Sequence, residues 1–346
     1  MTEPPSPLRM LLSRHTKRRE FITLLGGAAA SATWPRGTPA QRAVRVPTVG
    51  VLWHAASAEE EGPYFTALIE GFRALGYVDG RNIKFEHRFP NEMPERFTSM
   101  AAELVSLNVD VLVSVGNAAA PYAKNATATI PIVFTLVADP VESKLVASFS
   151  RPGGNVTGLS TFAADLVGRR LQALKEMIPG LSRIAQLVNP NAQASRMNIE
   201  VSGAAAAQLG LTVQTFEARS LDQLESAFGA IARAGMQAVT VSQGEGLPFQ
   251  GRHIIAKLAI AHRLALCAFS RETFEPGALM AYGTDHIAVI RRVGVYVDKI
   301  LKGANPSELP VEGPTKFELL VNLKTAKAIG IELSPSMLAR ADEVIE

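Results

Sequence analysis

Short apolar runs rich in β-branched residues alternate with longer Ala- and Leu-rich stretches from residue 44 onward, and this alternation limits the fold more than any other feature. Residues 109–115 and 130–137 are continuous apolar runs, which are typical of strands covered on both faces. Residues 118–126, which lie between them, have the composition and length of a helix. Strand–helix–strand units of this kind form right-handed crossovers in a parallel sheet. The sequence therefore predicts an α/β fold.

The alternation stops at the turn-rich residues 151–158 and then starts again, which predicts two lobes. A second series of helices and strands occupies residues 165–269, and the helical and strand-like patterns of the tail suggest that the chain returns to the first lobe and crosses back. We expect two α/β lobes with parallel sheets joined by hinge segments. The N-terminal lobe would comprise residues 41–158 and 284–309, and the C-terminal lobe residues 159–283 and 310–346. A hinged cleft between them suits a ligand that is trapped by closure.

Residues 1–40 have the pattern of an export signal and linker. The basic residues Lys17, Arg18 and Arg19 precede a mild apolar run over residues 21–32, and small residues follow it. Residues 16–22 resemble the twin-arginine export signature. The run spans about a dozen residues, whereas a stable membrane span needs roughly 20, so we expect a removable signal rather than an anchor. Export would place the mature chain in a bacterial periplasm, and no other run approaches spanning length.

The charge balance argues against nucleic acid as a partner. The chain has 35 Lys and Arg residues against 32 Asp and Glu residues. Six basic and two acidic residues fall in the first forty positions, which leaves 29 basic against 30 acidic residues in the body. Because the basic surplus belongs to the leader, the body lacks a footprint for polyphosphate.

Sequence motifs for catalysis and for cofactor or metal binding are missing. The sequence has no Walker A pattern, no Gly-x-Gly-x-x-Gly after the first strand, no Gly-x-Ser-x-Gly elbow and no His-Glu-x-x-His pair. The six histidines lack metal-ligand spacing; His54 and His286 could line a cleft, but we interpret them as surface or structural residues. Cys267 is the single cysteine and cannot form an internal disulfide. We expect no cofactor, no metal and no catalytic residue.

Polar residues follow the predicted strands at the points where those strands end, and in open parallel sheets that edge faces the ligand crevice. Asn117 directly precedes a predicted helix, whose free N–H groups could hold a carboxylate. Arg271 could clamp a carboxylate, or it could form a rim salt bridge with Glu272 or Glu275. Turn and N-cap roles are the alternative for the asparagines. The candidates for ligand contact on these grounds are Ser57, Asn117, Thr135, Asp139, Asn189, Asn191, Gln243, Glu245, Ser270 and Arg271.

Several segments together resemble a known family. The most specific is Arg-Pro-Gly-Gly-Asn-Val-Thr-Gly at residues 151–158, and the others are residues 130–134, 139–141, 187–190, 282–285, 300–303, 316–319 and 322–343. With these segments the chain resembles the substrate-binding proteins of ABC transporters, in the branch related to uptake of tryptophan and other aromatic amino acids. The similarity spans essentially the whole mature chain and includes the leader.

This resemblance implies a type I periplasmic-binding fold, in which three segments cross between two Rossmann-like lobes and the ligand lies between them. By position, Asn117, Thr135, Thr161, Asn189 and Asp285 match sites where the family presents ligand-facing groups. The chain departs from the aromatic-amino-acid pattern at Thr161 and at residues 270–272, where that branch usually has Asp, and at residues 242–245.

The function that follows is an extracytoplasmic solute-binding protein of an ABC importer. It would capture a small organic molecule, an amino acid or related carboxylate, between its lobes and deliver it to permease subunits in the inner membrane. A periplasmic ligand-sensing module that signals to a membrane kinase is an alternative, and a two-lobe α/β enzyme is another.

Overall fold

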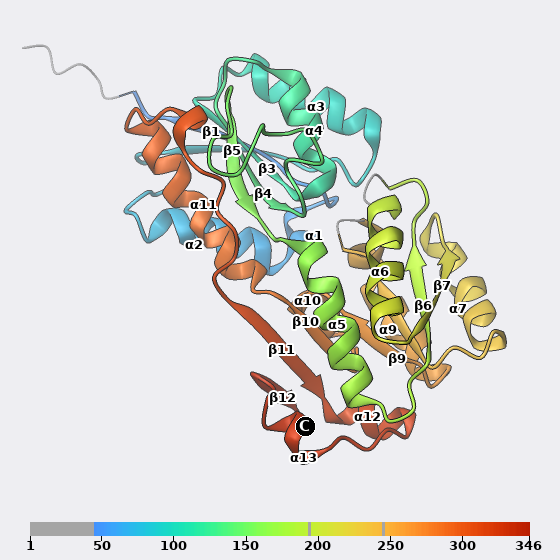
Figure 1. Cartoon of the computed structure of the whole chain (residues 1–346). Coiled ribbons are helices and arrows are strands. Elements are labelled where there is room, and N and C mark those ends of the chain that lie inside the picture. Colours follow the sequence, from blue (N-terminus) through green and yellow to red (C-terminus); the bar gives the residue numbers. More distant parts are fainter. Residues whose placement is uncertain (1–44, 193–194, 244–245) are drawn as a thin grey trace, which may run out of the picture. The chain divides into compact units, whose positions relative to one another are not determined.

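The computed structural model describes residues 45–192, 195–243 and 246–346. The predicted export signal and the candidate Glu245 lie outside the described residues. Val46–Glu346 form one compact unit, which contains two β-sheets with helices on both faces of each (Figure 1).

The first sheet is entirely parallel and has the strand order β2-β1-β3-β4-β5. One face packs on α2 and α11, and the other on α3 and α4. All five residues of β3 are buried, as the continuous apolar run predicts for a strand covered on both sides. The strands are β1 (Thr48–Leu52), β2 (Lys84–Arg88), β3 (Val111–Val115), β4 (Ile132–Val137) and β5 (Val156–Ser160), and the helices are α1 (Ala58–Glu61), α2 (Pro63–Arg73), α3 (Pro94–Ser106), α4 (Gly116–Ala126) and α11 (His286–Leu301).

The second sheet has the order β12-β11-β10-β9-β8-β6-β7. One face packs on α5 and α6, and the other on α7 and α9. Its strands are β6 (Arg183–Val188), β7 (Thr212–Glu217), β8 (Ala238–Val241), β9 (Ala265–Ala268), β10 (Met280–Thr284), β11 (Phe317–Asn322) and β12 (Glu343–Ile345). Its α-helices are α5 (Ala163–Met177), α6 (Ser195–Gln208), α7 (Leu224–Arg233), α8 (Gly246–Gln250), α9 (Arg252–Ala261), α10 (Arg271–Phe274), α12 (Leu323–Ile329) and α13 (Pro335–Leu338). In the described residues, 3₁₀ turns also lie at Leu221–Gln223 and Pro306–Glu308.

Two glycines explain how a helix from late in the chain joins the first sheet. A Cβ added to Gly71 of α2 would lie 2.2 Å from the carbonyl oxygen of Arg291 in α11, and one added to Gly294 of α11 would lie 3.0 Å from the backbone of Gly71. The backbones of α2 and α11 therefore approach as closely as only glycine allows. Figure 1 shows the two helices side by side.

The structure differs from the sequence prediction in three elements. The turn-rich residues 151–158 are not all connection, because β5 (Val156–Ser160) begins within them and joins the first sheet. β11 pairs antiparallel with β10, so the second sheet is not wholly parallel. β12 was not predicted, because a strand of three residues has too little pattern to detect.

Candidate ligand-binding site

A cavity of about 70 Å³ lies where the carboxyl ends of strands from both sheets meet. The first sheet and its helices contribute residues that follow β1, begin α4 or lie in α2, and the second contributes residues that follow β8 and β9. Its lining residues are His54, Tyr64, Glu92, Gly116, Asn117, Ala118, Leu136, Gln243, Gly246, Phe249, Phe269 and His286. The cavity is therefore lined by side chains from both lobes.

The N-terminus of α4 forms one wall of this cavity. Within the described part of the chain, no side chain caps this helix, whose N-cap is Val115. The Asn117 carboxamide oxygen accepts a hydrogen bond from the N–H of Ala138 at 2.9 Å, which fixes the Asn117 side chain against the end of β4. The first N–H groups of the helix are left for a ligand, and the helix dipole favours an anion there.

His54 lies beside this helix end. A Cβ added to Gly116 would lie 3.3 Å from the His54 ring, so the ring and the α4 backbone are in close contact. The ring nitrogens lie 3.4 Å from the Glu61 carboxylate and 3.2 Å from that of Glu92. Burial alone would lower the pKa of His54, but the Glu61 and Glu92 carboxylates, with Glu60, outweigh it and raise the pKa to about 9. At neutral pH the ring is therefore a cation on the cavity wall.

Glu61 holds His54 in place and is itself buried. Its carboxylate accepts hydrogen bonds from the backbone N–H groups of His54 and Ala55, at 3.1 and 2.8 Å. Burial raises the pKa of Glu61, against the opposing effect of the His54 charge and these two N–H groups. Glu92 lines the cavity as well, which places an acidic group near the cation.

Aromatic rings form the apolar part of the wall. Tyr64 of α2 stacks on Phe249 of α8 with ring centroids 5.5 Å apart, and His54 meets Phe249 edge-on at 5.1 Å. Phe269 lies at the end of β9 with its ring 6.3 Å from that of His286. A flat apolar or aromatic group can pack between such rings.

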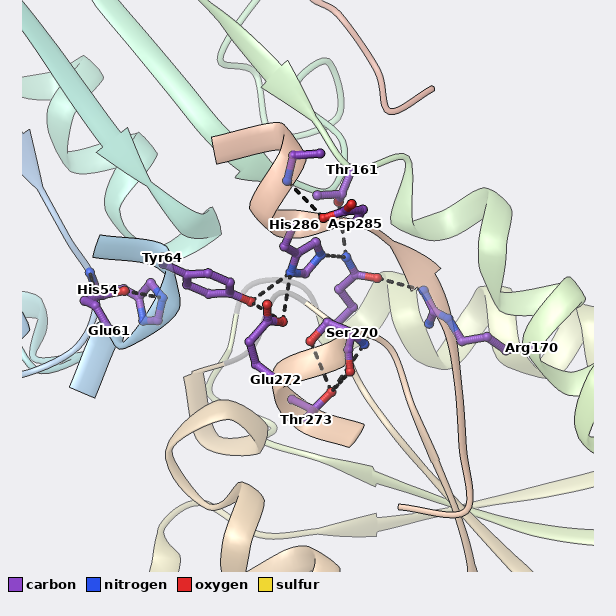
Figure 2. A network of polar contacts seen from close by, with 12 residues as sticks. His54, Glu61, Tyr64, Thr161, Arg170, Ser270, Glu272, Thr273, Asp285 and His286 are labelled. Atoms are coloured by element: carbon purple, nitrogen blue, oxygen red, sulfur yellow. Dashed lines mark hydrogen bonds and ion pairs between the residues drawn. The ribbon is translucent and has the colours of Figure 1, made fainter. Parts of the chain in front are cut away.

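A buried polar network forms the floor of the cavity (Figure 2). The Tyr64 hydroxyl donates to the Glu272 carboxylate at 2.9 Å and lies 2.9 Å from Nδ1 of His286. On the other side of the ring, Nε2 of His286 lies 3.5 Å from Nε2 of Gln243, which donates to the Thr161 hydroxyl at 3.2 Å. Burial lowers the pKa of His286 to about 4, with Arg170 adding to the effect, so this ring is neutral at pH 7.

Of the residues predicted from the sequence, the structure brings Asn117 and Gln243 to the cavity. Thr161 contacts Gln243 from behind the wall, and buried Thr135 precedes the lining residue Leu136. Among the described residues, the Thr135 hydroxyl has no hydrogen-bond partner.

The other predicted residues have local structural roles. Ser57 caps α1, Asp285 caps α11 and Ser270 forms a capping box with Thr273. Asn189 accepts a hydrogen bond from the N–H of Asn191 in the turn after β6. Arg271 forms ion pairs with Glu318 and Glu343 rather than with Glu272 or Glu275. Neither these residues nor Arg271 line the cavity.

Sequence reasoning missed most of the aromatic wall. Phe269 directly follows β9, so the strand-end rule would have found it had the rule not been limited to small polar and charged residues. His54 and His286, for which the sequence leaves a cleft position open beside a surface or structural role, both line the cavity. Tyr64 and Phe249 lie on helices, and nothing in the sequence indicates that these helix faces meet.

A second cavity of about 470 Å³ lies further out between the lobes, and Asn117 lines both. Asp139 and Glu142 line it from the first lobe, and Arg196 and Glu200 from α6. In the described ranges, no three His, Cys, Asp or Glu residues are grouped as a metal site would need. None of the helices found there has the length and apolar character to cross a bilayer.

Comparison with known proteins adds a consistent set of relatives. A sequence model described as "ABC transporter substrate binding protein" matches residues 61–345. A tyrosine-binding protein of Clostridioides difficile is 27% identical over 265 residues, which cover 76% of this chain and 75% of the relative. A conserved domain protein from Vibrio cholerae is similar in structure, with a TM-score of 0.81 and 28% identity over 87% of this chain and 100% of the other. An ABC domain from Streptococcus pneumonia in complex with L-Trp has a TM-score of 0.80 and 24% identity, over 86% of this chain and 99% of the other.

Proposed function

The chain belongs to the ABC transporter substrate-binding protein family, and from this premise we propose that it captures an amino acid with an aromatic or apolar side chain in the inner cavity and delivers it to a permease of an ABC importer. The observation that carries the proposal is the uncapped N-terminus of α4 beside the His54 cation, in a cavity that the rings of Phe249 and Phe269 also line. These groups together suit a molecule with a carboxylate at one end and an apolar body.

The carboxylate would bind at the start of α4. There the N–H groups of the first turn supply hydrogen-bond donors, and the His54 ring supplies a positive charge. A carboxylate binds such groups strongly where carboxylate and donors are partly desolvated. The hydrogen bond from the N–H of Ala138 holds the Asn117 side chain against the end of β4, so this side chain does not block the start of α4.

The ammonium group would pair with Glu92. Its carboxylate lies 3.2 Å from the His54 ring and lines the same cavity, so a zwitterion could place one charge on each partner. The departures from the aromatic-amino-acid pattern at Thr161 and at residues 270–272 do not remove this acidic group, because Glu92 comes from a different segment. The names of two relatives, which bind tyrosine and L-Trp, support the same class of ligand.

Capture would require the lobes to open. Ligand sites for small molecules usually measure about 300–1,000 Å³, far more than the 70 Å³ of the inner cavity. We propose that residues 41–158 with 284–309 move against residues 159–283 with 310–346, and that the ligand stabilises the closed form because only that form supplies contacts from both lobes. The protein would have no catalytic activity of its own. Export by the twin-arginine route to the periplasm is part of the proposal and rests on the leader sequence.

The test is a set of thermal unfolding and calorimetric measurements on the mature protein. L-Tyrosine, L-tryptophan and L-phenylalanine are compared with tyramine and tryptamine, which lack the carboxylate, and with 3-phenylpropionate, which lacks the ammonium. We expect the amino acids to raise the unfolding midpoint, because any ligand that binds only the folded state must do so. No shift from any amino acid or carboxylate in a broad panel would refute the proposal.

A matched pair of variants locates the carboxylate. Asn117→Asp adds a negative charge at the start of α4 and should weaken binding at least about tenfold through repulsion of the ligand carboxylate. Asn191→Asp makes the same change on an exposed turn that does not line the cavity and should leave the affinity unchanged.

A further inference from the structure

Arg170 of α5 is a buried cation that the binding site does not use directly. It is 7% exposed, and among the described residues no carboxylate lies within ion-pair distance of it. Its guanidinium donates to the carbonyl oxygen of Tyr282 at 2.8 Å and to Oε1 of Gln243 at 2.7 Å. A buried charge with only neutral partners is costly, so its retention calls for a reason beyond packing.

The contact with Gln243 has a directional consequence. A guanidinium can only donate hydrogen bonds, so the Gln243 atom that meets Arg170 must be the carboxamide oxygen. The NH₂ group of Gln243 is thereby turned toward Thr161 and Nε2 of His286. Since this NH₂ group can only donate, Nε2 of His286 must accept. A neutral His286 then carries its proton on Nδ1.

The direction of the hydrogen bonds continues from His286 through Tyr64 to Glu272. With its proton on Nδ1, His286 donates to the Tyr64 oxygen, and the Tyr64 hydroxyl donates to the Glu272 carboxylate. Every hydrogen bond from Arg170 to Glu272 then points the same way, from a buried cation to a buried carboxylate. Tyr64 of α2 and His286 of α11 come from helices that pack on the first sheet, whereas Arg170, Gln243 and Glu272 belong to the second lobe.

We propose that Arg170 is a positioning residue that sets the hydrogen-bond direction of the cavity floor through Gln243, His286 and Tyr64. Because Arg170 occupies the acceptor atom of Gln243, the NH₂ group of Gln243 faces away from Arg170 and can only donate. One N–H donates to Thr161, and the other, among the described residues, makes only the 3.5 Å contact with His286, which a ligand acceptor can share as a three-centre hydrogen bond. The floor therefore favours a ligand with an acceptor there, such as a carboxylate or a carbonyl oxygen, and disfavours an amine. This last step rests on the proposed function, whereas the hydrogen-bond direction itself does not.

The direction of these hydrogen bonds can be measured in the ligand-free protein through the tautomer of His286. Nitrogen-15 NMR of the ligand-free, labelled mature protein distinguishes a histidine protonated on Nδ1 from one protonated on Nε2, and the His286 signals are identified by their loss in His286→Asn. We expect a neutral His286 with its proton on Nδ1 at pH 7. A proton on Nε2 in the unaltered protein would overturn the proposal at once.

Substitutions at Gln243 and Arg170 test whether these residues set the direction of the hydrogen bonds. In Gln243→Glu the new carboxylate still accepts from Arg170 but can no longer donate to His286, so the proton should move to Nε2. Arg170→Lys keeps a donor-only cation and should preserve the original tautomer, whereas Arg170→Met should give a mixture. An unchanged tautomer in Gln243→Glu would overturn the proposal. In this variant the buried Arg170 still has a partner, so the test can be made even if Arg170→Met does not fold. Gln237→Glu, on the surface near Gly180, is the matched control and should leave His286 unaffected.

The consequence for the ligand is measured separately, by comparing the affinities for L-tyrosine and tyramine. In Gln243→Glu the preference for L-tyrosine over tyramine should fall at least about tenfold, because a carboxylate replaces a donor. If His286 changes tautomer as expected but neither compound binds the unaltered protein, the amino acid assignment fails while the role of Arg170 stands. If both bind and the preference stays constant, the selectivity claimed for Gln243 is wrong.

Discussion

The Tyr64 hydroxyl on α2 donates a 2.9 Å hydrogen bond to the Glu272 carboxylate on α10, and both side chains are buried. The two residues are 208 positions apart and belong to elements that pack on different sheets. Burial raises the pKa of Tyr64 well above its ordinary value, and Glu272 adds to the effect, so the hydroxyl keeps its proton and remains a donor. The proposed opening of the lobes would break this bond.

Tyr64→Phe should therefore shift the ligand-free protein toward an open form. Removing the hydroxyl leaves Glu272 buried without this donor, which should cost the closed form about 1.5–3 kcal/mol relative to the open form, the usual value for a hydrogen bond to a charged group. Small-angle X-ray scattering should show a larger radius of gyration for the ligand-free variant. An unchanged scattering profile would mean that Tyr64 contributes nothing to closure.

Tyr77→Phe is the matched control for this measurement. The Tyr77 hydroxyl donates to Asp298 of α11 at 2.8 Å, and Tyr77 and α11 both pack on the first sheet. Its loss should lower the free energy of unfolding without changing the scattering profile.

The alternation of strands and helices predicted the parallel part of the fold. Strand-end reasoning predicted the position of Asn117, because the carboxyl ends of parallel strands meet at one edge whatever the details of packing. It could not predict Tyr64 or Phe249, since their meeting depends on how two lobes close and not on either local sequence. The same limit applies to Arg271, whose partner Glu343 lies 72 residues away on β12, a strand that the pattern did not reveal. Asp285, Ser57 and Ser270 cap helices, a role that the same residue types serve whether or not a ligand is near.

The charge on His54 should make the free energy of unfolding decrease as the pH becomes alkaline. Its pKa rises from 6.5 in the unfolded chain to about 9 in the folded protein. The stabilisation is therefore fully present below pH 6.5 and is lost as the pH rises through 9, to a total of at most about 3 kcal/mol. Denaturant unfolding at pH 6.5, 8 and 9.5 should show this decline in the unaltered protein and a flatter profile in His54→Gln. Parallel profiles for the two proteins would show that the His54 charge does not stabilise the fold.

Gly71→Ala should be strongly destabilising, because the new Cβ would lie 2.2 Å from the carbonyl oxygen of Arg291 and both are fixed backbone positions. Forcing α2 and α11 apart should cost about 1–3 kcal/mol of unfolding free energy or more. Gly203→Ala in α6 is the control, since an added Cβ there meets nothing within 4 Å. It should be neutral or stabilise the protein by up to about 1 kcal/mol through helix propensity. If the two substitutions changed the free energy of unfolding equally, the close approach of α2 and α11 would not be the reason that position 71 requires glycine.

Arg271→Ala tests whether this arginine contacts the ligand or only braces the second sheet. Its guanidinium lies 3.1 Å from Glu318 and 2.7 Å from Glu343, and it does not line the cavity. The side chain is about one-third exposed, so the loss of both ion pairs should lower the free energy of unfolding by no more than about 1 kcal/mol. Calorimetry with L-tyrosine and L-tryptophan should give the same affinity as for the unaltered protein. A loss of about tenfold or more, with stability unchanged, would instead place Arg271 at the ligand carboxylate, as a bidentate clamp would require.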